Sequence, residues 1–182
     1  MNQSGPLRQS DRGEVNLIIR EAQPETDWLT GIWPIFQGIV RVGDTYAFAP
    51  DIDEASARQQ WLLPAPARVF VAVNERDGAI VGTSLIKANQ PALGEHVANA
   101  AFMVATDAAG HGVGRALAEH AIEWARQADF SAMQFNFVVS TNLRAIALWK
   151  NLGFSIVGTI PLAFHHKGLG RKVDVFVMHR FL

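Results

Sequence analysis

The sequence predicts one α/β domain in which a mixed β-sheet is flanked by helices. From Val15 onward, short apolar runs typical of strands alternate with amphipathic stretches typical of helices. The predicted order is a strand, helices, three strands, and then helix, strand, helix and two strands, which favours a mixed sheet over two separate domains. No repeat, low-complexity block or linker divides residues 15–182, and the polar residues 1–14 are expected to form a flexible tail.

The first elements follow from local composition. Residues 15–20 predict a strand, and residues 24–40 predict a helix, or two helices interrupted at Pro34. A turn-rich loop follows at 43–51. Residues 53–63 predict a short helix, because acidic residues near its start suit the positive end of a helix dipole.

A hairpin and a third strand come next. Residues 67–74 and 79–88 are β-rich runs on either side of an Asp-Gly turn, which is a strong hairpin signal. Residues 96–105 are mostly small and apolar and predict a strand. Residues 114–128 predict a helix, since Leu117 begins an apolar series at four-residue spacing.

The C-terminal third completes the sheet. Residues 132–139 alternate as a strand, and residues 142–154 predict a helix that ends at Gly153. Two more strands, 154–164 and 172–182, follow and are joined by a loop.

Composition limits the classes of partner. The formal net charge is −1, which offers no electrostatic basis for binding nucleic acid or an anionic membrane. There is no cysteine for a disulfide or a thiol nucleophile, and no pair of histidines has metal-ligand spacing with a third partner. No apolar run approaches the roughly 20 residues of a membrane span. We expect a cytoplasmic protein with no metal.

Three glycines at alternate positions, Gly110, Gly112 and Gly114, precede the predicted helix. A phosphate-binding P-loop would need Gly-Lys-Ser/Thr, and a dinucleotide fold would need G-x-G-x-x-G and an acidic residue in the next strand. Neither is present. Two interpretations stay open from the glycines alone: a tight turn, or a helix N-terminus whose free N–H groups bind a diphosphate.

A second segment, TNLRAIALWKNLGF at 141–154, favours the diphosphate. Together with VATDAAGHGVGRAL, at 104–117, it resembles the GCN5-related N-acetyltransferase (GNAT) superfamily, in particular bacterial enzymes of the small-molecule type. The resemblance implies acetyl-CoA as cosubstrate and a mostly antiparallel sheet with one parallel, splayed strand pair. Those strands would end at Val104 and Val138.

The resemblance also implies roles for individual residues. Backbone groups of Phe102, Met103 and Val104 would pair with the pantetheine arm, and Asn142 would bond the cofactor's amide region. Trp149 would donate to the sulfur or pack against the pantetheine, or else be a core aromatic. The diphosphate would bind the backbone at Gly110, His111, Gly112, Val113, Gly114 and Arg115.

Two positions depart from the family pattern. Ala109 replaces an Arg or Gln, and Trp149 replaces the tyrosine thought to protonate the leaving thiolate, a task for which an indole N–H is far too weak an acid. The chain's one tyrosine, Tyr46, is therefore the only candidate phenolic acid, although a packing role explains it equally well.

An attacking amine needs a base or a water chain, because an alkylamine has a pKa of roughly 10. The candidates are Glu95 and His96 at the start of the central strand, and His165 or His166 before the last loop. The histidines elsewhere, including His120 on the exposed side of a helix, are expected to be structural or solvated.

The predicted function is acetyl-CoA-dependent acetylation of a primary amine on a small molecule by direct attack. Most of the acceleration would come from holding the reactants together, with an oxyanion donor from the backbone near Val104. Two alternatives stay open: an acyl-CoA-binding or regulatory module that has lost catalysis, and a protein or peptide N-acetyltransferase. Pairing of subunits is common in the superfamily, so the resemblance admits a homodimer.

Overall fold

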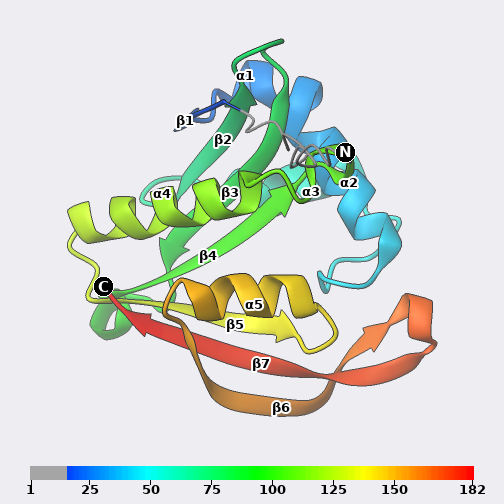
Figure 1. The fold of residues 1–182 in the computed structure, drawn as a ribbon, viewed down its shortest axis with the longest axis vertical. Coiled ribbons are helices and arrows are strands. Elements are labelled where there is room, and N and C mark those ends of the chain that lie inside the picture. The colour runs from blue at the N-terminus through cyan, green and yellow to red at the C-terminus, as the bar shows by residue number, and fades with distance from the viewer. Residues whose placement is uncertain (1–15) are drawn as a thin grey trace, which may run out of the picture.

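A seven-stranded sheet forms the centre of the protein, in a computed structural model that describes residues 16–182 (Figure 1). The predicted flexible tail lies outside the described residues. The strands lie in the order β1-β2-β3-β4-β5-β7-β6. Their bounds are β1 Leu17–Glu21, β2 Arg68–Asn74, β3 Ile80–Ala88, β4 Val97–Val104, β5 Ala132–Val139, β6 Ser155–His166 and β7 Arg171–Phe181.

Helices cover both faces of the sheet. The α-helices are α1 Pro24–Asp27, α2 Trp33–Val42, α3 Glu54–Trp61, α4 Val113–Gln127 and α5 Leu143–Asn151, with a π-helical turn at Trp28–Ile32. Short 3₁₀ turns span Ala92–Gly94, Thr106–Ala108 and Lys167–Leu169. In Figure 1, α4 and α5 lie in front of the sheet.

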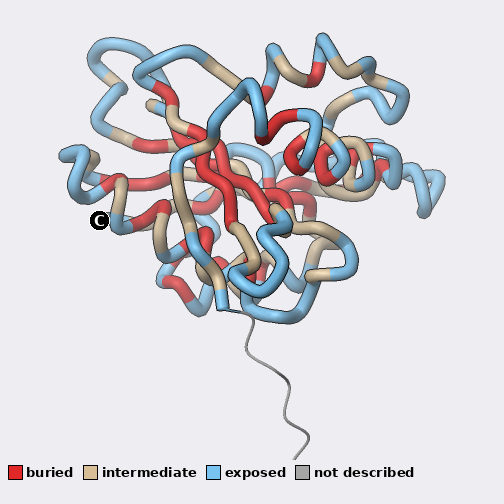
Figure 2. The backbone as a smooth tube through the Cα atoms, turned by 90° about the horizontal axis from the view of Figure 1, so that it is seen from above, coloured by how far each residue is buried: buried red, intermediate tan, exposed pale blue. Residues whose placement is uncertain are grey.

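Two hydrophobic clusters sit on the two faces. Ala98 and Ala100 of β4 belong to a cluster with α4 and α5, whereas Met103 belongs to another with the π turn, α2 and α3. The division follows the period of two in a strand, which sends successive side chains to opposite faces. Seen from above, buried strands run through the middle of the molecule (Figure 2).

One strand pair is parallel, as the resemblance implies. β4 and β5 pair only at Val97–Ala132 and Ala98–Met133, near their N-terminal ends. Beyond these residues the two strands diverge, while β4 stays paired with β3 and β5 stays paired with β7. The fold is thus a mostly antiparallel sheet with one splayed parallel pair, which confirms the predicted fold class.

The helical segment after β1 differs in detail from the prediction. The interruption falls in the π turn at Trp28–Ile32, and Pro34 lies in the first turn of α2. A proline is tolerated there, because the first N–H groups of an α-helix have no intrahelical acceptor in any case. The predicted break at Pro34 is therefore wrong, although the predicted helices are present.

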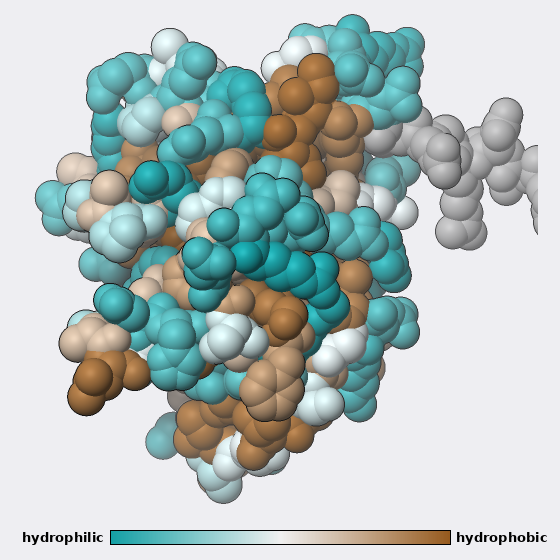
Figure 3. Space-filling model, turned by 90° about the vertical axis from the view of Figure 1, so that its left-hand side faces the viewer, coloured by the Kyte–Doolittle hydropathy of each residue, from teal (hydrophilic) through white to brown (hydrophobic). Residues whose placement is uncertain are grey.

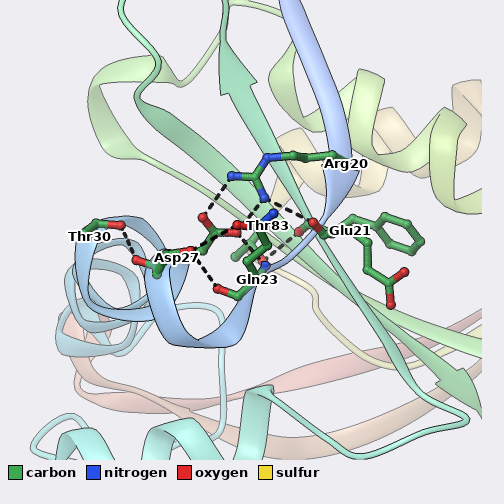
Figure 4. Close-up of polar contacts among 8 residues, drawn as sticks. Arg20, Glu21, Gln23, Asp27, Thr30 and Thr83 are labelled. Carbon is green, nitrogen blue, oxygen red and sulfur yellow. Dashed lines mark hydrogen bonds and ion pairs between the residues drawn. The ribbon is translucent and has the colours of Figure 1, made fainter.

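An ion pair fixes this segment to the sheet edge (Figure 4). The guanidinium of Arg20 donates to both carboxylate oxygens of Asp27, at 2.6 and 2.9 Å, and the backbone N–H of Gln23 donates to Asp27 at 2.7 Å. Asp27 is buried, and the hydrogen bond from Arg20 lowers the pKa of its carboxyl group below the ordinary value. The buried charge is thus paired and hydrogen-bonded.

Strands β6 and β7 leave apolar side chains exposed. Figure 3 shows apolar surface at the lower end of the molecule, where these strands lie in Figure 1. Val157 and Phe181 are among the exposed large hydrophobic residues, at 60% and 81%. None of the helices in residues 16–182 is long and apolar enough to cross a membrane.

Candidate active site

The divergence of β4 and β5 leaves a cavity of about 350 Å³ in the sheet. Its walls come from both strands, from the loop after α2, and from α5. The lining residues are Thr45, Tyr46, Ala47, Phe48, Asn99, Ala100, Ala101, Phe102, Phe135, Asn136, Phe137, Val138, Val139, Asn142, Ala145 and Trp149.

Alternate residues of β4 direct their backbone groups into the gap. The N–H of Ala105 donates to Val81 at 2.9 Å and the carbonyl of Val97 accepts from Asn89 at 2.7 Å, so odd-numbered residues bond toward β3. By the alternation of a strand, Met103 also faces β3, and Phe102 and Val104 face the gap. Two of the three predicted backbone sites thus face the gap, and of these Phe102 lines the cavity.

The Tyr46 side chain already hydrogen-bonds to the gap-facing backbone groups of Phe102. Its hydroxyl donates to the Phe102 carbonyl at 2.7 Å and accepts from the Phe102 N–H at 3.1 Å. Gly43, at φ +69°, ends α2 in a left-handed conformation and starts the loop, and the Tyr46 ring then stacks on Phe48. Burial raises the pKa of Tyr46 well above its ordinary value, so the side chain is a neutral phenol.

The glycine-rich turn leads into α4. Gly110 and Gly112 have φ of +86° and +85°, which side chains other than glycine rarely adopt. A Cβ at either would meet no atom within 4 Å, so conformation and not space requires glycine. A Cβ on Gly114 would make ordinary contacts with Val104 and Leu148.

Several N–H groups at this helix start point to no acceptor. Within residues 16–182, no hydrogen bond is found from the backbone N–H of Gly110, Gly112, Val113, Gly114 or Arg115. α4 has 15 residues, so its dipole adds partial positive charge at the same end. The arrangement can bind an anion of diphosphate size.

The side chains of this turn contribute less to anion binding than its backbone does. The guanidinium of Arg115 pairs with Glu119 one turn along α4, at 3.3 Å, and both are solvent-exposed. His111 is exposed. Ala109 supplies no polar side chain, so the anion-binding capacity of the turn lies in its backbone.

Asn142 and Trp149 both line the cavity from α5. The Asn142 side-chain oxygen accepts from the Ala145 N–H at 3.2 Å and caps the helix, which leaves its NH₂ group available. Trp149 is 8% exposed and packs on Phe102 and Phe135, with ring centroids 5.1 and 4.7 Å apart. Its indole N–H has no acceptor among the described residues.

Glu95 and His96 lie apart from the cavity. Both are exposed and precede β4, at the end where β4 and β5 are still paired. Six residues of extended chain separate His96 from Phe102, or about 20 Å. Although Glu95 and His96 adjoin the central strand in sequence, they lie at the end opposite to the one where the strands diverge.

The two adjacent histidines of β6 differ in position. His165 is exposed and does not line the cavity, because the alternation of the strand turns it away from the face that buries Phe164. His166 lies in a small outer hollow with Asp44 and Arg144, which shares Thr45 and Asn142 with the cavity. Its Nδ1 accepts from the Leu169 N–H at 3.3 Å.

An amide network crosses the gap, and the sequence analysis missed it. Asn99 donates to the Gln134 carbonyl at 2.8 Å, the Gln134 side chain donates to Asn136 at 2.8 Å, and Asn136 donates to Asn89 at 2.6 Å. The available signal was the alternation in residues 132–139, which leaves polar side chains on one face of the strand.

His120 is also not where the sequence analysis put it. Its ring meets the edge of Phe70 with centroids 4.5 Å apart, and its Nδ1 is buried without a hydrogen-bond partner. Desolvation lowers its pKa. Over residues 16–182, no group of three acidic or histidine side chains could hold a metal ion.

Comparisons with known proteins agree with this geometry. Residues 27–154 match the model of the acetyltransferase (GNAT) family. The structure is similar to that of a GCN5-related N-acetyltransferase from Kribbella flavida, with 45% identity, coverage of 91% of this chain and 98% of the other, and a TM-score of 0.85. It is also similar to yncA from Salmonella typhimurium, solved with acetyl-CoA, at 24% identity, 92% and 94% coverage, and a TM-score of 0.76.

The match to a curated relative covers a smaller part of both chains. N-acetyltransferase aca1 from Schizosaccharomyces pombe is 32% identical over 114 residues, which are 63% of this chain and 54% of the relative. The match thus spans about half the length of that relative.

Proposed function

The chain belongs to the acetyltransferase (GNAT) family, with acetyl-CoA as cosubstrate, and we propose that it acetylates a primary amine of a small molecule by direct attack. The amine nitrogen would form a bond to the thioester carbonyl carbon, and the carbon–sulfur bond would break with its electron pair on sulfur. The proton that the nitrogen loses would pass through solvent to the thiolate, which leaves as the thiol. The observation that carries the proposal is the cavity itself, which lies where β4 and β5 stop pairing.

The backbone would hold the cosubstrate. The N–H groups from Gly110 to Arg115 would bind the diphosphate, because they lie at the positive end of α4 and have no acceptor in the described chain. The gap-facing groups of Phe102 and Val104 would pair with the pantetheine as a strand would. The free NH₂ of Asn142 would donate to a pantetheine carbonyl.

Positioning would supply most of the rate enhancement. Two reactants held in one cavity gain effective concentration, and a backbone N–H near Val104 would stabilise the developing oxyanion. The indole N–H of Trp149 would donate a hydrogen bond to the sulfur. Tyr46 would stay a neutral hydrogen-bond donor, since its raised pKa makes proton transfer to a thiolate unfavourable.

Trp149 also supports a second candidate, an acyl-CoA-binding or regulatory module without catalysis. The position carries no acid that could protonate a thiolate. A protein or peptide acceptor is a third candidate, and it differs from the first only in what the amine is attached to.

Two measurements separate acetyl transfer from the binding module. Acetyl-CoA at millimolar concentration should raise the melting temperature, and thiol release should follow when small primary amines are added. A raised melting temperature without thiol release over a broad amine panel would support the binding module. No change in melting temperature would contradict both.

A further inference from the structure

The cavity passes through the sheet and has two chemically distinct sides. Phe135 and Trp149 line it on the α5 side, where the proposed function puts the thioester. Asn99, Asn136 and Phe137 line the opposite side, next to the loop that carries Tyr46. Because the cosubstrate would enter past α4 and α5, the opposite side is left for the acceptor. The inference therefore rests on the proposed function.

Every side chain that lines the cavity is uncharged. The polar groups are the indole N–H of Trp149 and the hydroxyls and amides of Thr45, Tyr46, Asn99, Asn136 and Asn142. Burying a carboxylate among such groups is costly, because no cation in the described lining would pair with it. The acceptor should thus be uncharged next to its amine.

The hydrogen-bonding groups still available on this side are few. Asn136 uses its oxygen and its NH₂ within the amide network, and Asn99 uses its NH₂. The oxygen of Asn99 accepts no bond within residues 16–182, and the Thr45 hydroxyl is buried without a partner. These two groups can receive an amine N–H and donate to a carbonyl oxygen.

The lining offers no base to deprotonate the amine, so the pKa of the amine itself must be low. Tyr46 is its one titratable group, and burial keeps that phenol protonated. Asp44, Arg144 and His166 lie in the outer hollow, where the His166 Nδ1 is engaged by Leu169. An amine that is already neutral near pH 8 needs no base, and an α-amino group next to an amide has a pKa of about 7.7–8.0, against about 10.4 for an alkylamine.

We propose that the acceptor is an α-amino amide: a primary amine whose neighbouring carbon carries an uncharged amide carbonyl. The amine would bond to Asn99, and the carbonyl would accept from the Thr45 hydroxyl. A free amino-acid amide and the N-terminal residue of a peptide share this chemistry. A free amino acid does not, since it places a carboxylate in the same position.

Three acceptors that share the same side chain test the proposal: L-leucinamide, L-leucine and 3-methylbutylamine. Each is assayed with acetyl-CoA by thiol release at pH 7.5. Leucinamide should exceed 3-methylbutylamine in kcat/KM by roughly 200-fold, the ratio of their neutral fractions, and leucine should be no better than 3-methylbutylamine. Raising the pH to 9.5 should increase kcat/KM roughly threefold for leucinamide and roughly 90-fold for 3-methylbutylamine.

Thr45→Val keeps the shape of the side chain and removes the hydroxyl. It should reduce the ratio of leucinamide to 3-methylbutylamine activity about fivefold, the value of one hydrogen bond to a neutral partner. A peptide amide beginning with Leu-Gly distinguishes the two sources: activity equal to that of leucinamide indicates an open site for chain termini, and activity confined to leucinamide indicates a closed one.

Two outcomes would overturn the inference. Turnover of leucine or 3-methylbutylamine at or above that of leucinamide at pH 7.5 would overturn it and leave the proposed acetyl transfer standing. Stabilisation by acetyl-CoA with no thiol release from these acceptors would overturn the inference, and the same result over the broad amine panel would also overturn the proposed acetyl transfer.

Discussion

The hydroxyl of Tyr46 bridges the backbone N–H and carbonyl of Phe102, which lies 56 residues further along the chain. This contact joins the loop after α2 to the edge of β4 at the point where β5 has turned away. It also occupies backbone groups that the proposed function assigns to the pantetheine. Tyr46 should therefore compete with acetyl-CoA for Phe102.

Replacement of Tyr46 by phenylalanine tests that competition. Tyr46→Phe removes two partly buried hydrogen bonds and should lower the free energy of unfolding by about 1–2 kcal/mol. It should also lower the Kd for acetyl-CoA, measured by calorimetric titration, because Phe102 is then unoccupied. A higher Kd in a folded variant would show instead that the hydroxyl assists acetyl-CoA binding.

Trp149→Phe tests the proposed donor to the sulfur. The variant keeps an aromatic ring against Phe102 and Phe135 and removes the indole N–H. We expect kcat to fall about fivefold with little change in acetyl-CoA affinity, since one hydrogen bond made in the transition state is worth about 1 kcal/mol. Trp124→Phe on α4, outside the cavity lining, is the matched control. Equal losses in both would indicate a packing effect only.

Asp27→Asn tests the buried ion pair. Arg20 is 37% exposed and keeps partial access to water, so we expect a loss of about 2 kcal/mol in unfolding free energy at pH 7. The pKa of Asp27 is lowered in the folded state, so this stabilisation is present above the ordinary pKa and is lost as the pH falls through the folded value. Urea unfolding at pH 7 and pH 3 should show the difference shrinking in acid.

The exposed pair Arg58–Glu25 supplies the control for that measurement. The Glu25 side chain is 88% exposed, and Glu25→Gln should change stability by less than about 0.5 kcal/mol at either pH. A loss as large as that of Asp27→Asn would mean that net charge, and not the buried pair, controls the acid response.

His120 should make the fold less stable in mild acid. Its pKa is lowered by desolvation, so the unfolded chain binds a proton at higher pH than the folded chain does. Stability should thus fall as the pH drops below about 6.5. His120→Gln should flatten the dependence of melting temperature between pH 7 and pH 5, and His111→Gln, at an exposed site, should not. Identical slopes in wild type and His120→Gln would refute this role.

Local patterns predicted the parts of the fold that depend on neighbours in sequence. The Asp-Gly turn predicted the β2–β3 hairpin, and Gly153, at φ +84°, predicted the end of α5. The glycine turn predicted the start of α4. Each of these depends on a few consecutive residues, so the sequence contained the whole signal.

The rest depended on contacts between distant segments. Nothing local to Tyr46 points to Phe102, and nothing local to His120 indicates that Phe70 covers its ring. Glu95 and His96 were chosen because they adjoin the central strand, but the gap opens at the other end of it. The end at which two strands diverge is set by their pairing, which a single sequence does not contain.

Acetyl-CoA titration of two glycine variants tests whether the turn before α4 binds the diphosphate of acetyl-CoA. Gly112 and Gly78 both have positive φ, and a Cβ at either meets nothing within 4 Å, but Gly78 lies in the β2–β3 turn. Alanine should strain both turns by a similar amount. We predict that Gly112→Ala weakens acetyl-CoA binding at least tenfold while Gly78→Ala leaves the Kd unchanged. Equal Kd values for the two variants would show that this turn does not bind the diphosphate.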